Sequence, residues 1–380
     1  MTAIISRPDT LKKLEILSAD AQYDLACACS GKDDDKRVRG SEGKWIYPVS
    51  LPNGGKSVLF KTLMSNACGN DCRYCPLRED MDLRRVSLGP EETARVFMEY
   101  WRRGKVFGMF LSSGVCGSPD ATMDRLNATA KILRAKHGFR GFIHLKVIPG
   151  ASAGAIREAV SLASAVSLNI ETPGAGKLAK LSGKKDFMRD IVEPIKMISR
   201  LTAKGERYAR VKQTTQFIVG AAGESDAEIV KYMGGMYDRL KMHRIFFSAY
   251  QKGLGHEAMP GEQAEVQRAE DTFTREHRLY QVDFLLRKYG FKDEDIVYGE
   301  GGQLSLDADP KEVWAEAHPE FFPLDVNRAR RKDLLRVPGL GPVTVRRIMK
   351  MRKEGKIGRI EDVGKVGKLL GKAEGFLRFD

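Results

Sequence analysis

The sequence predicts an α/β fold, with a parallel sheet of six strands followed by a small all-α domain. Strand-like apolar runs alternate with helix-like amphipathic segments from about residue 56 to 250. Further along, a Pro-Gly-Leu-Gly-Pro stretch at 338–342 separates two short helix-like segments. The charge also changes along the chain: of a net +14, residues 325–380 carry +9. These three observations divide the chain into an α/β core and a basic C-terminal domain.

The strands and helices of the core follow one another in strict order. The six expected strands are residues 57–64, 106–114, 142–148, 166–171, 210–220 and 244–250. The five helices expected between them are residues 89–104, 121–138, 152–163, 186–203 and 224–240. Because every strand but the last is followed by a helix, the strands should be parallel with right-handed crossovers. Periodicity does not decide whether the sheet is flat or curved.

The remaining segments complete a division into four parts. Residues 1–55 form a polar N-terminal extension with an exposed charged loop at 31–44, and residues 56–250 form the core. Residues 251–324 hold a long amphipathic helix at 263–289 and an irregular connection, and residues 325–380 form the C-terminal domain. The N-terminus shows no secretory signal and no apolar run is long enough to span a membrane, so we expect a cytoplasmic protein.

Three cysteines, Cys68, Cys72 and Cys75, lie within eight residues in the loop after the first expected strand. A structural zinc site usually takes four ligands, and a ferredoxin cluster takes four cysteines. Three thiolates suit three irons of a cubane cluster, with the fourth iron open to a small molecule. Cys27 and Cys29 are too close together for an ordinary zinc hook and are expected to be packing residues.

This cysteine motif, with Tyr74 just before its last cysteine, resembles the signature of the radical S-adenosylmethionine superfamily. The resemblance implies a partial (β/α)6 barrel and one [4Fe–4S] cluster held by the three cysteines. It also implies S-adenosylmethionine on the open iron, cleaved by one electron to a 5′-deoxyadenosyl radical. The further cofactor contacts that it implies are Tyr74, Ser112, Ser113, Gly114, Asn169, Glu171, Gly220 and Gly223. Ser112–Gly114 departs from the usual Gly-Gly-Glu.

Polar residues within the expected strands indicate a solvated substrate cavity, since a strand facing a core should be nearly all apolar. They could equally face helices or solvent at a rim. Basic residues here would suit an anionic substrate such as a nucleotide. The pocket candidates are Lys146, Lys212, Gln216 and Tyr250 on the strands, with Cys116 close to the second strand.

The C-terminal stretch 334–352 resembles the helix-hairpin-helix motif that binds DNA. Backbone N–H groups at the start of the second helix would form an anion site for a phosphate. A small core of Val337, Leu340, Val343, Val345 and Ile348 should join the two helices. The expected nucleic-acid contacts are Pro338, Gly339, Gly341, Arg346, Arg347 and Lys350. A degenerate second hairpin follows at 362–377.

The pairing of the two modules resembles the DNA modification and repair radical S-adenosylmethionine proteins that are linked in genomes to a uracil-DNA-glycosylase-like protein. It implies DNA, duplex or single-stranded, as a partner, a flavodoxin- or ferredoxin-type electron donor, and possible contact with that glycosylase-like protein. Three alternatives stay open at this point: an RNA-modifying enzyme of the superfamily, a nonenzymatic DNA-bound redox protein, and a methylthiotransferase-like enzyme with a second cluster.

Overall fold

The computed structural model describes residues 8–21, 43, 45–50, 55–264 and 269–380. The chain divides into two compact units, which we describe separately. The first comprises Met1–Glu224 and Arg239–Val266, and the second comprises Ser225–Asp238 and Gln267–Asp380. Most of the predicted charged loop at 31–44 lies outside the described residues, as do Cys27 and Cys29.

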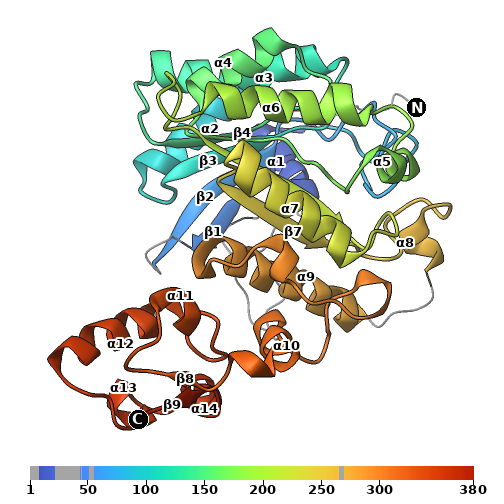
Figure 1. Ribbon diagram of the computed structural model, residues 1–380. Coiled ribbons are helices and arrows are strands. Elements are labelled where there is room, and N and C mark those ends of the chain that lie inside the picture. Colours follow the sequence, from blue (N-terminus) through green and yellow to red (C-terminus); the bar gives the residue numbers. More distant parts are fainter. Residues whose placement is uncertain (1–7, 22–42, 44, 51–54, 265–268) are drawn as a thin grey trace, which may run out of the picture. The chain divides into compact units, whose positions relative to one another are not determined.

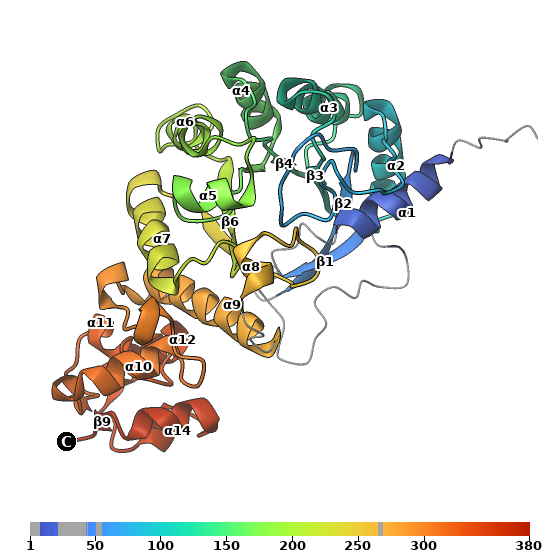
Figure 2. The same ribbon diagram turned by 90° about the vertical axis from the view of Figure 1, so that its right-hand side faces the viewer.

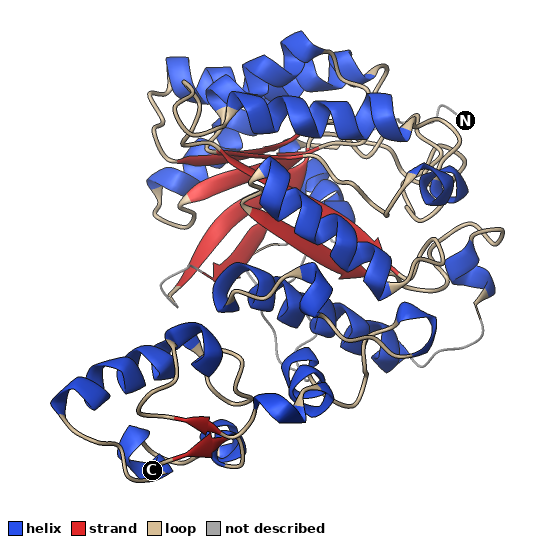
Figure 3. Cartoon of the chain, viewed as in Figure 1, coloured by secondary structure: helices blue, strands red, loops and turns tan. Residues whose placement is uncertain are grey.

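The first unit is built on a curled seven-stranded sheet that forms a half-barrel, with its strands in sequence order (Figures 1 and 3). The strands are β1 (Ile46–Ser50), β2 (Lys56–Leu63), β3 (Gly108–Ser112), β4 (Phe142–Lys146), β5 (Ala165–Ser167), β6 (Lys212–Val219) and β7 (Arg244–Ala249). Strands β2 to β7 are parallel, as the sequence predicts. The short strand β1 was not predicted, and it pairs antiparallel with β2 along the edge of the sheet.

Helices of the first unit cover the outer face of the half-barrel (Figure 2). They include α2 (Pro90–Arg102), α3 (Pro119–Lys131), α4 (Ala153–Leu162) and α6 (Glu193–Leu201), and the first unit also contains α1 (Thr10–Asp20), α5 (Ala175–Leu181) and α8 (Pro260–Gln263). Local sequence explains where several begin: Pro90 is the first residue of α2, and the hydroxyls of Ser118 and Ser152 cap α3 and α4. Helices α1 and α5 were not predicted.

The core of this unit lies between the sheet and the helices. The ring of Phe60 on β2 packs edge-on against Phe97 of α2, with ring centroids 5.8 Å apart, and Phe97 continues to Phe139 at 5.1 Å. Side chains of the opposite strand face point into the half-barrel. The alternation of the two faces therefore separates an apolar core from a more polar interior.

The second unit contains the remaining helices. They are α7 (Asp226–Leu240), α9 (Ala269–Phe284), α10 (Pro310–Ala317), α11 (Arg331–Leu334), α12 (Pro342–Glu354), α13 (Ile360–Val363) and α14 (Lys368–Glu374). Two-residue strands β8 (Leu324–Asp325) and β9 (Leu377–Arg378) pair in parallel, so the prediction of an all-α C-terminal domain is wrong in this detail. Helix α10 also adds regular structure to a segment predicted to be irregular. None of the described helices combines the length and apolar character needed to cross a membrane.

Candidate active site

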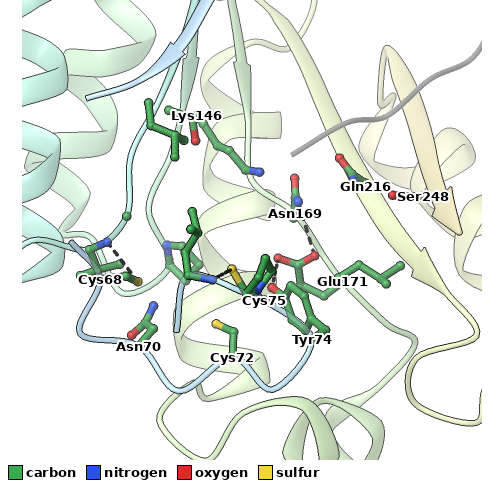
Figure 4. Close-up of a pocket in the computed structure, with 18 of the residues that line it drawn as sticks. Cys68, Asn70, Cys72, Tyr74, Cys75, Lys146, Asn169, Glu171, Gln216 and Ser248 are labelled. Carbon is green, nitrogen blue, oxygen red and sulfur yellow. Dashed lines mark hydrogen bonds between the residues drawn. The ribbon is translucent and has the colours of Figure 1, made fainter. Parts of the chain in front are cut away.

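The cysteine loop, residues 64–87, leaves the C-terminal end of β2 and lies over the mouth of the half-barrel. Cys68, Cys72 and Cys75 all line a cavity of about 200 Å³ at this end of the parallel strands (Figure 4). The carboxyl ends of strands in a parallel barrel are where ligand sites form. The sequence-predicted metal ligands are therefore brought together in one cavity.

A single arginine fixes the path of the cysteine loop. The guanidinium of Arg85 donates hydrogen bonds to four backbone carbonyls. These are the carbonyl groups of Asn66, Leu77, Arg78 and Met81, at 2.6 to 2.9 Å. They lie on both sides of the cysteine motif, so one planar side chain ties the loop's two ends together.

Two further contacts anchor the loop to the rest of the first unit. Gly114 donates its N–H to the carbonyl oxygen of Ser65 at 2.7 Å. A Cβ added at Gly114 would lie 2.7 Å from the Ala67 carbonyl oxygen, so only glycine permits this approach. On the other side, Asp71 accepts hydrogen bonds from the Ser182 hydroxyl at 2.5 Å and the Gly183 N–H at 2.7 Å.

The thiols have surroundings that suit iron–sulfur ligation. The N–H groups of Val115 and Leu77 donate to the sulfurs of Cys68 and Cys75, each at 3.4 Å. Such hydrogen bonds stabilise ligating thiolates and set cluster potentials. Burial raises the pKa of the Cys75 thiol to about 12, so the thiol keeps its proton unless metal binding displaces it.

The donor set fits a cluster better than a single ion. Within the described residues, no three His, Cys, Asp or Glu side chains converge on one metal position. In a [4Fe–4S] cluster each thiolate binds a different iron, so three spaced thiols around one cavity are what it needs. Three ligands from the chain would leave one iron of such a cluster open to a small molecule.

The cavity also gathers most of the predicted cofactor contacts. Tyr74, Ser112, Ser113, Gly114, Asn169 and Glu171 all line it. Gly220 and Gly223 do not line it. They form a turn with positive φ values of 89° and 73°, in which buried Glu224 accepts the N–H groups of Gly220 and Ala222.

Glu171 occupies an unusual backbone position in this cavity. It has φ of 65°, which is uncommon for a residue other than glycine, and its side chain is 5% exposed. Its carboxylate accepts from the Tyr74 hydroxyl at 2.8 Å and the Asn169 amide at 3.4 Å. Burial, together with this neighbouring carboxylate, raises the pKa of Tyr74 well above its usual value. Tyr74 is therefore a fixed, neutral hydrogen-bond donor.

The pocket candidates divide into two groups. Lys146, Gln216 and Tyr250 line the cavity, and the first two point into it together with Ser248 (Figure 4). Lys212 is the first residue of β6, at the opposite end of the strand from this cavity. It is exposed there and does not line the cavity. Cys116 lies beyond the cavity wall, and its N–H donates to the Thr122 hydroxyl at 3.0 Å.

Lys185 was missed by the sequence analysis. It lines the cavity from the segment after α5, with its ammonium 5.7 Å from the centre of the Tyr74 ring. Burial acts to lower the pKa of Lys185, but the neighbouring Cys72 and Glu171 outweigh it and raise the pKa. Lys185 and Tyr74 are 111 residues apart, and no local pattern in the sequence marks this proximity.

In the second unit, helices α11 and α12 flank residues 335–341, the stretch for which the sequence predicts a helix-hairpin-helix motif. Val337, Leu340, Val345 and Ile348 are buried in its core, as predicted, whereas Val343 is 68% exposed on the first turn of α12. Val343 was thus wrongly assigned to the core, because the proline-led turn points it outward.

The predicted nucleic-acid contacts lie in two settings. Pro338 is buried, and Gly339 has φ of 81° beside the Leu369 carbonyl at the start of α14. Arg346, Arg347 and Lys350 are exposed on α12. A second short helix pair, α13 and α14, follows at the position of the predicted degenerate hairpin.

Comparisons with known proteins concern mainly the first unit. Residues 62–234 match the family model described as the radical SAM superfamily. Members of that superfamily bind a [4Fe–4S] cluster and S-adenosylmethionine. A search of curated proteins finds no match.

Several solved structures align with part of this chain at low identity. The FeFe-hydrogenase maturase HydG from Carboxydothermus hydrogenoformans shares 14% identity over 60% of this chain and 50% of its own, with a TM-score of 0.45. Methylornithine synthase (PylB) shares 15% over 59% and 62%, also with a TM-score of 0.45. The radical S-adenosylmethionine methyltransferase TsrM from Kitasatospora setae shares 14% over 51% and 37%, with a TM-score of 0.39. This chain spans less than two thirds of the length of each.

Proposed function

We propose that this chain, which contains a radical SAM superfamily domain at residues 62–234, is an enzyme that modifies or repairs DNA by radical chemistry. The observation that carries the proposal is the convergence of Cys68, Cys72 and Cys75 on one cavity with the polar ends of the parallel strands. When bound, the cluster and S-adenosylmethionine supply a 5′-deoxyadenosyl radical, which abstracts a hydrogen atom from an unreactive C–H bond.

The residues of the chain bind and orient these groups. The three thiols hold the cluster, and Arg85 keeps their loop in place. Ser112–Gly114 at the end of β3 and Asn169 after β5 line the cavity with polar groups that would bind S-adenosylmethionine. The hydroxyl of Tyr74 is held by Glu171, and Tyr74 would help to position the same cofactor.

DNA as the substrate is supported by the C-terminal charge and by the exposed basic side chains of α12. Residues 325–380 carry 16 lysines and arginines against 7 acidic residues. Arg346 and Lys350 are exposed there, close in the chain to Gly339, which has positive φ. Contacts of this kind bind the phosphate backbone with little sequence preference and depend strongly on salt.

The test of the radical function is anaerobic reconstitution, reduction with a flavodoxin-type donor or dithionite, and measurement of 5′-deoxyadenosine. Cys72→Ala should abolish the product. Cys116→Ala is the matched control, because this thiol does not line the cavity, and it should form the product as the wild type does. A wild-type protein that holds four irons yet makes no 5′-deoxyadenosine would contradict the radical function and favour a nonenzymatic DNA-bound redox protein.

The test of the DNA function is the salt dependence of binding. Arg346→Ala should weaken binding to any DNA sequence and reduce the slope of log K against log salt by about 0.9 for duplex DNA. Equal or tighter binding to structured RNA would favour an RNA-modifying enzyme instead. Stimulation of 5′-deoxyadenosine formation by DNA would indicate that DNA binding and radical formation belong to the same reaction.

A further inference from the structure

The connections that lead from a helix into each of the strands β3 to β7 lie at the N-terminal ends of these strands, opposite the cysteine cavity. In Figure 3 this is the end of the parallel sheet from which the arrows start. Four of the five connections, with the residues that flank them, are rich in lysine and arginine; these segments are residues 102–107, 136–141, 203–212 and 239–244. We call the lysine and arginine side chains of these four segments the basic face.

Cations dominate the charge of this face. The four segments hold twelve lysines and arginines and a single acidic residue, Glu206. Eleven of the twelve cations are exposed, and Arg244 is half-buried. Burial and the nearby charge of Arg140 both lower the pKa of Arg134, which shows that like charges act on one another here. A surface with so many cations and so few acids is complementary to a polyanion.

Two exposed aromatic side chains lie at the same end of the sheet. Trp101, in the last turn of α2, is 40% exposed, and Phe107, the residue before β3, is 37% exposed. Trp101 packs against Phe139 with ring centroids 5.3 Å apart, and Phe107 packs against Phe142 at 5.8 Å. Among the described residues of the first unit, no other tryptophan, tyrosine or phenylalanine is exposed. The exposed aromatic rings of this unit are therefore gathered beside its cations.

This combination favours single-stranded nucleic acid among the polyanions. Proteins that bind single strands use cations for the phosphates and aromatic side chains on which unpaired bases stack. The bases of a duplex are stacked on one another and must leave the helix before they can stack on a side chain. An acidic electron-donor protein fits this face less well, because it must approach the cysteine cavity, which lies at the other end of the parallel strands.

The length of the face suits a short strand. The starts of β3 to β7 lie in one row, because these strands are neighbours in sequence order. Adjacent strands are about 4.8 Å apart, so the row is about 19 Å long. With about 3.4 Å between the phosphates of one strand, the row faces about five or six nucleotides.

We propose that the basic face binds single-stranded DNA, with its cations on the phosphates and with Trp101 and Phe107 stacked on bases. The first unit thus holds a strand by contacts of its own, separate from those expected of the C-terminal residues. The choice of DNA over RNA rests on the proposed function. The match of charge, aromatic rings and length does not depend on it.

The first experiment measures binding of a labelled deoxythymidine decamer to the full chain by fluorescence anisotropy, over a range of salt concentrations. One double variant combines Arg207→Ala with Arg210→Ala, and a second combines Lys136→Ala with Arg140→Ala. Each should weaken binding about ten-fold or more and reduce the slope of log K against log salt by about 1.4, at about 0.7 for each phosphate contact.

The matched control combines Arg84→Ala with Arg157→Ala. It removes the same charge from two exposed residues of the first unit that lie outside the four segments, and it should bind the decamer as the wild type does. Thermal unfolding of each variant checks that it is folded.

The aromatic rings are tested by Trp101→Leu and Phe107→Leu, which keep an apolar side chain in contact with Phe139 and Phe142. Each should weaken binding of the decamer by about five-fold or more, because a stacked base is lost, and leave duplex binding unchanged. The decamer should also quench tryptophan fluorescence in the wild type, and Trp101→Leu should remove most of that quenching.

Four results would overturn the proposal. Three of them are unchanged decamer binding in both charge variants, an equal loss in the control, and unchanged binding in both ring variants. The fourth is loss of binding to a flavodoxin-type protein in the charge variants while their affinity for the decamer is unchanged, which would assign the face to an electron donor. Equal affinity for a uridine decamer would overturn the choice of DNA.

Two outcomes separate this inference from the proposed function. If Arg346→Ala weakens DNA binding and the variants of the basic face do not, the inference fails while the DNA function stands. If the decamer binds through the basic face but neither the decamer nor duplex DNA changes the formation of 5′-deoxyadenosine, the surface stands and the DNA function loses its support.

Discussion

Arg85 offers the sharpest test of how the cysteine loop is held. Replacing it by methionine keeps most of the side-chain volume but removes all four hydrogen bonds to the loop carbonyls. The loop should then open more often, because the remaining side-chain bonds of Ser65 and Asn66 reach only Arg84, Val86 and Ser87 at the far end of the loop, and neither of them holds residues 77–81. The cysteines would lose their common position before any cluster is inserted.

The size of the effect follows from the hydrogen bonds. Each contributes about 1 kcal/mol net, so four contribute about 4 kcal/mol to closing the loop. Arg85 is only half-buried, so water can replace part of the hydrogen bonding that is lost. The lower bound of the free energy lost on substitution is therefore about 2 kcal/mol. At about 1.4 kcal/mol for each factor of ten, the loop should open roughly thirty to a thousand times more often.

Amide hydrogen exchange of residues 66–81 measures this opening directly, and iron content after reconstitution measures its consequence. Arg84→Met is the matched control, because Arg84 is exposed and precedes Arg85 in the chain. The reasoning is refuted if Arg85→Met exchanges as slowly as the wild type and binds the same iron. It is also refuted if Arg84→Met loses as much protection.

Three further predictions concern packing and charge. Burial lowers the pKa of Lys311 to about 7, so from there to the ordinary lysine pKa of about 10.4 only the unfolded chain binds that proton. The free energy of unfolding of the second unit should therefore rise with pH in this window, and Lys311→Met should remove the rise. Gly114→Ala should cost about 1–3 kcal/mol and lower the iron content, because its methyl group would press on the Ala67 carbonyl. Gly339→Ala should destabilise the second unit by about 3 kcal/mol or more in chemical denaturation, because it combines a positive φ with overlap on the Leu369 carbonyl.

The glycine predictions have controls on the same chain. Gly176→Ala in α5 and Gly355→Ala after α12 place a methyl group in open space without a left-handed backbone, and both should leave stability nearly unchanged. Losses equal to those of the test variants would show that close packing is not the cause. If the free energy of unfolding of Lys311→Met still rises with pH in this window, the rise comes from a group other than Lys311.

The parallel strands were predictable because apolar residues recur along each of them and because helices with clear ends, such as α2 between Pro90 and Arg102, separate them. Strand β1 was not predictable, because its five residues include Pro48 and do not alternate regularly between apolar and polar. It is stabilised by pairing with β2. The cysteines were found because their spacing is local. Lys185 and Arg85 were not predicted, because their contacts form only in the folded chain and no spacing in the sequence indicates them.

Errors among the site residues have the same origin. Lys212 and Gln216 share one face of β6, and the sequence does not say that one lies at the exposed end and the other inside. Cys116 is close to Gly114 in sequence, but the chain turns away from the cavity before reaching it. On β6, the position of a residue along the strand, and not the face on which it lies, decided whether its assignment to the cavity was correct.

Tyr47 on strand β1 lines a cavity of about 170 Å³ inside the half-barrel, and β2 is the one described strand with which β1 pairs. The cysteine loop and the polar strand ends all lie on later parts of the chain. Changes in this one strand would alter the wall of that cavity and leave the cysteine loop untouched. A five-residue edge segment, and Tyr47 within it, is thus a place where the interior of the half-barrel can be reshaped separately from the cysteine cavity.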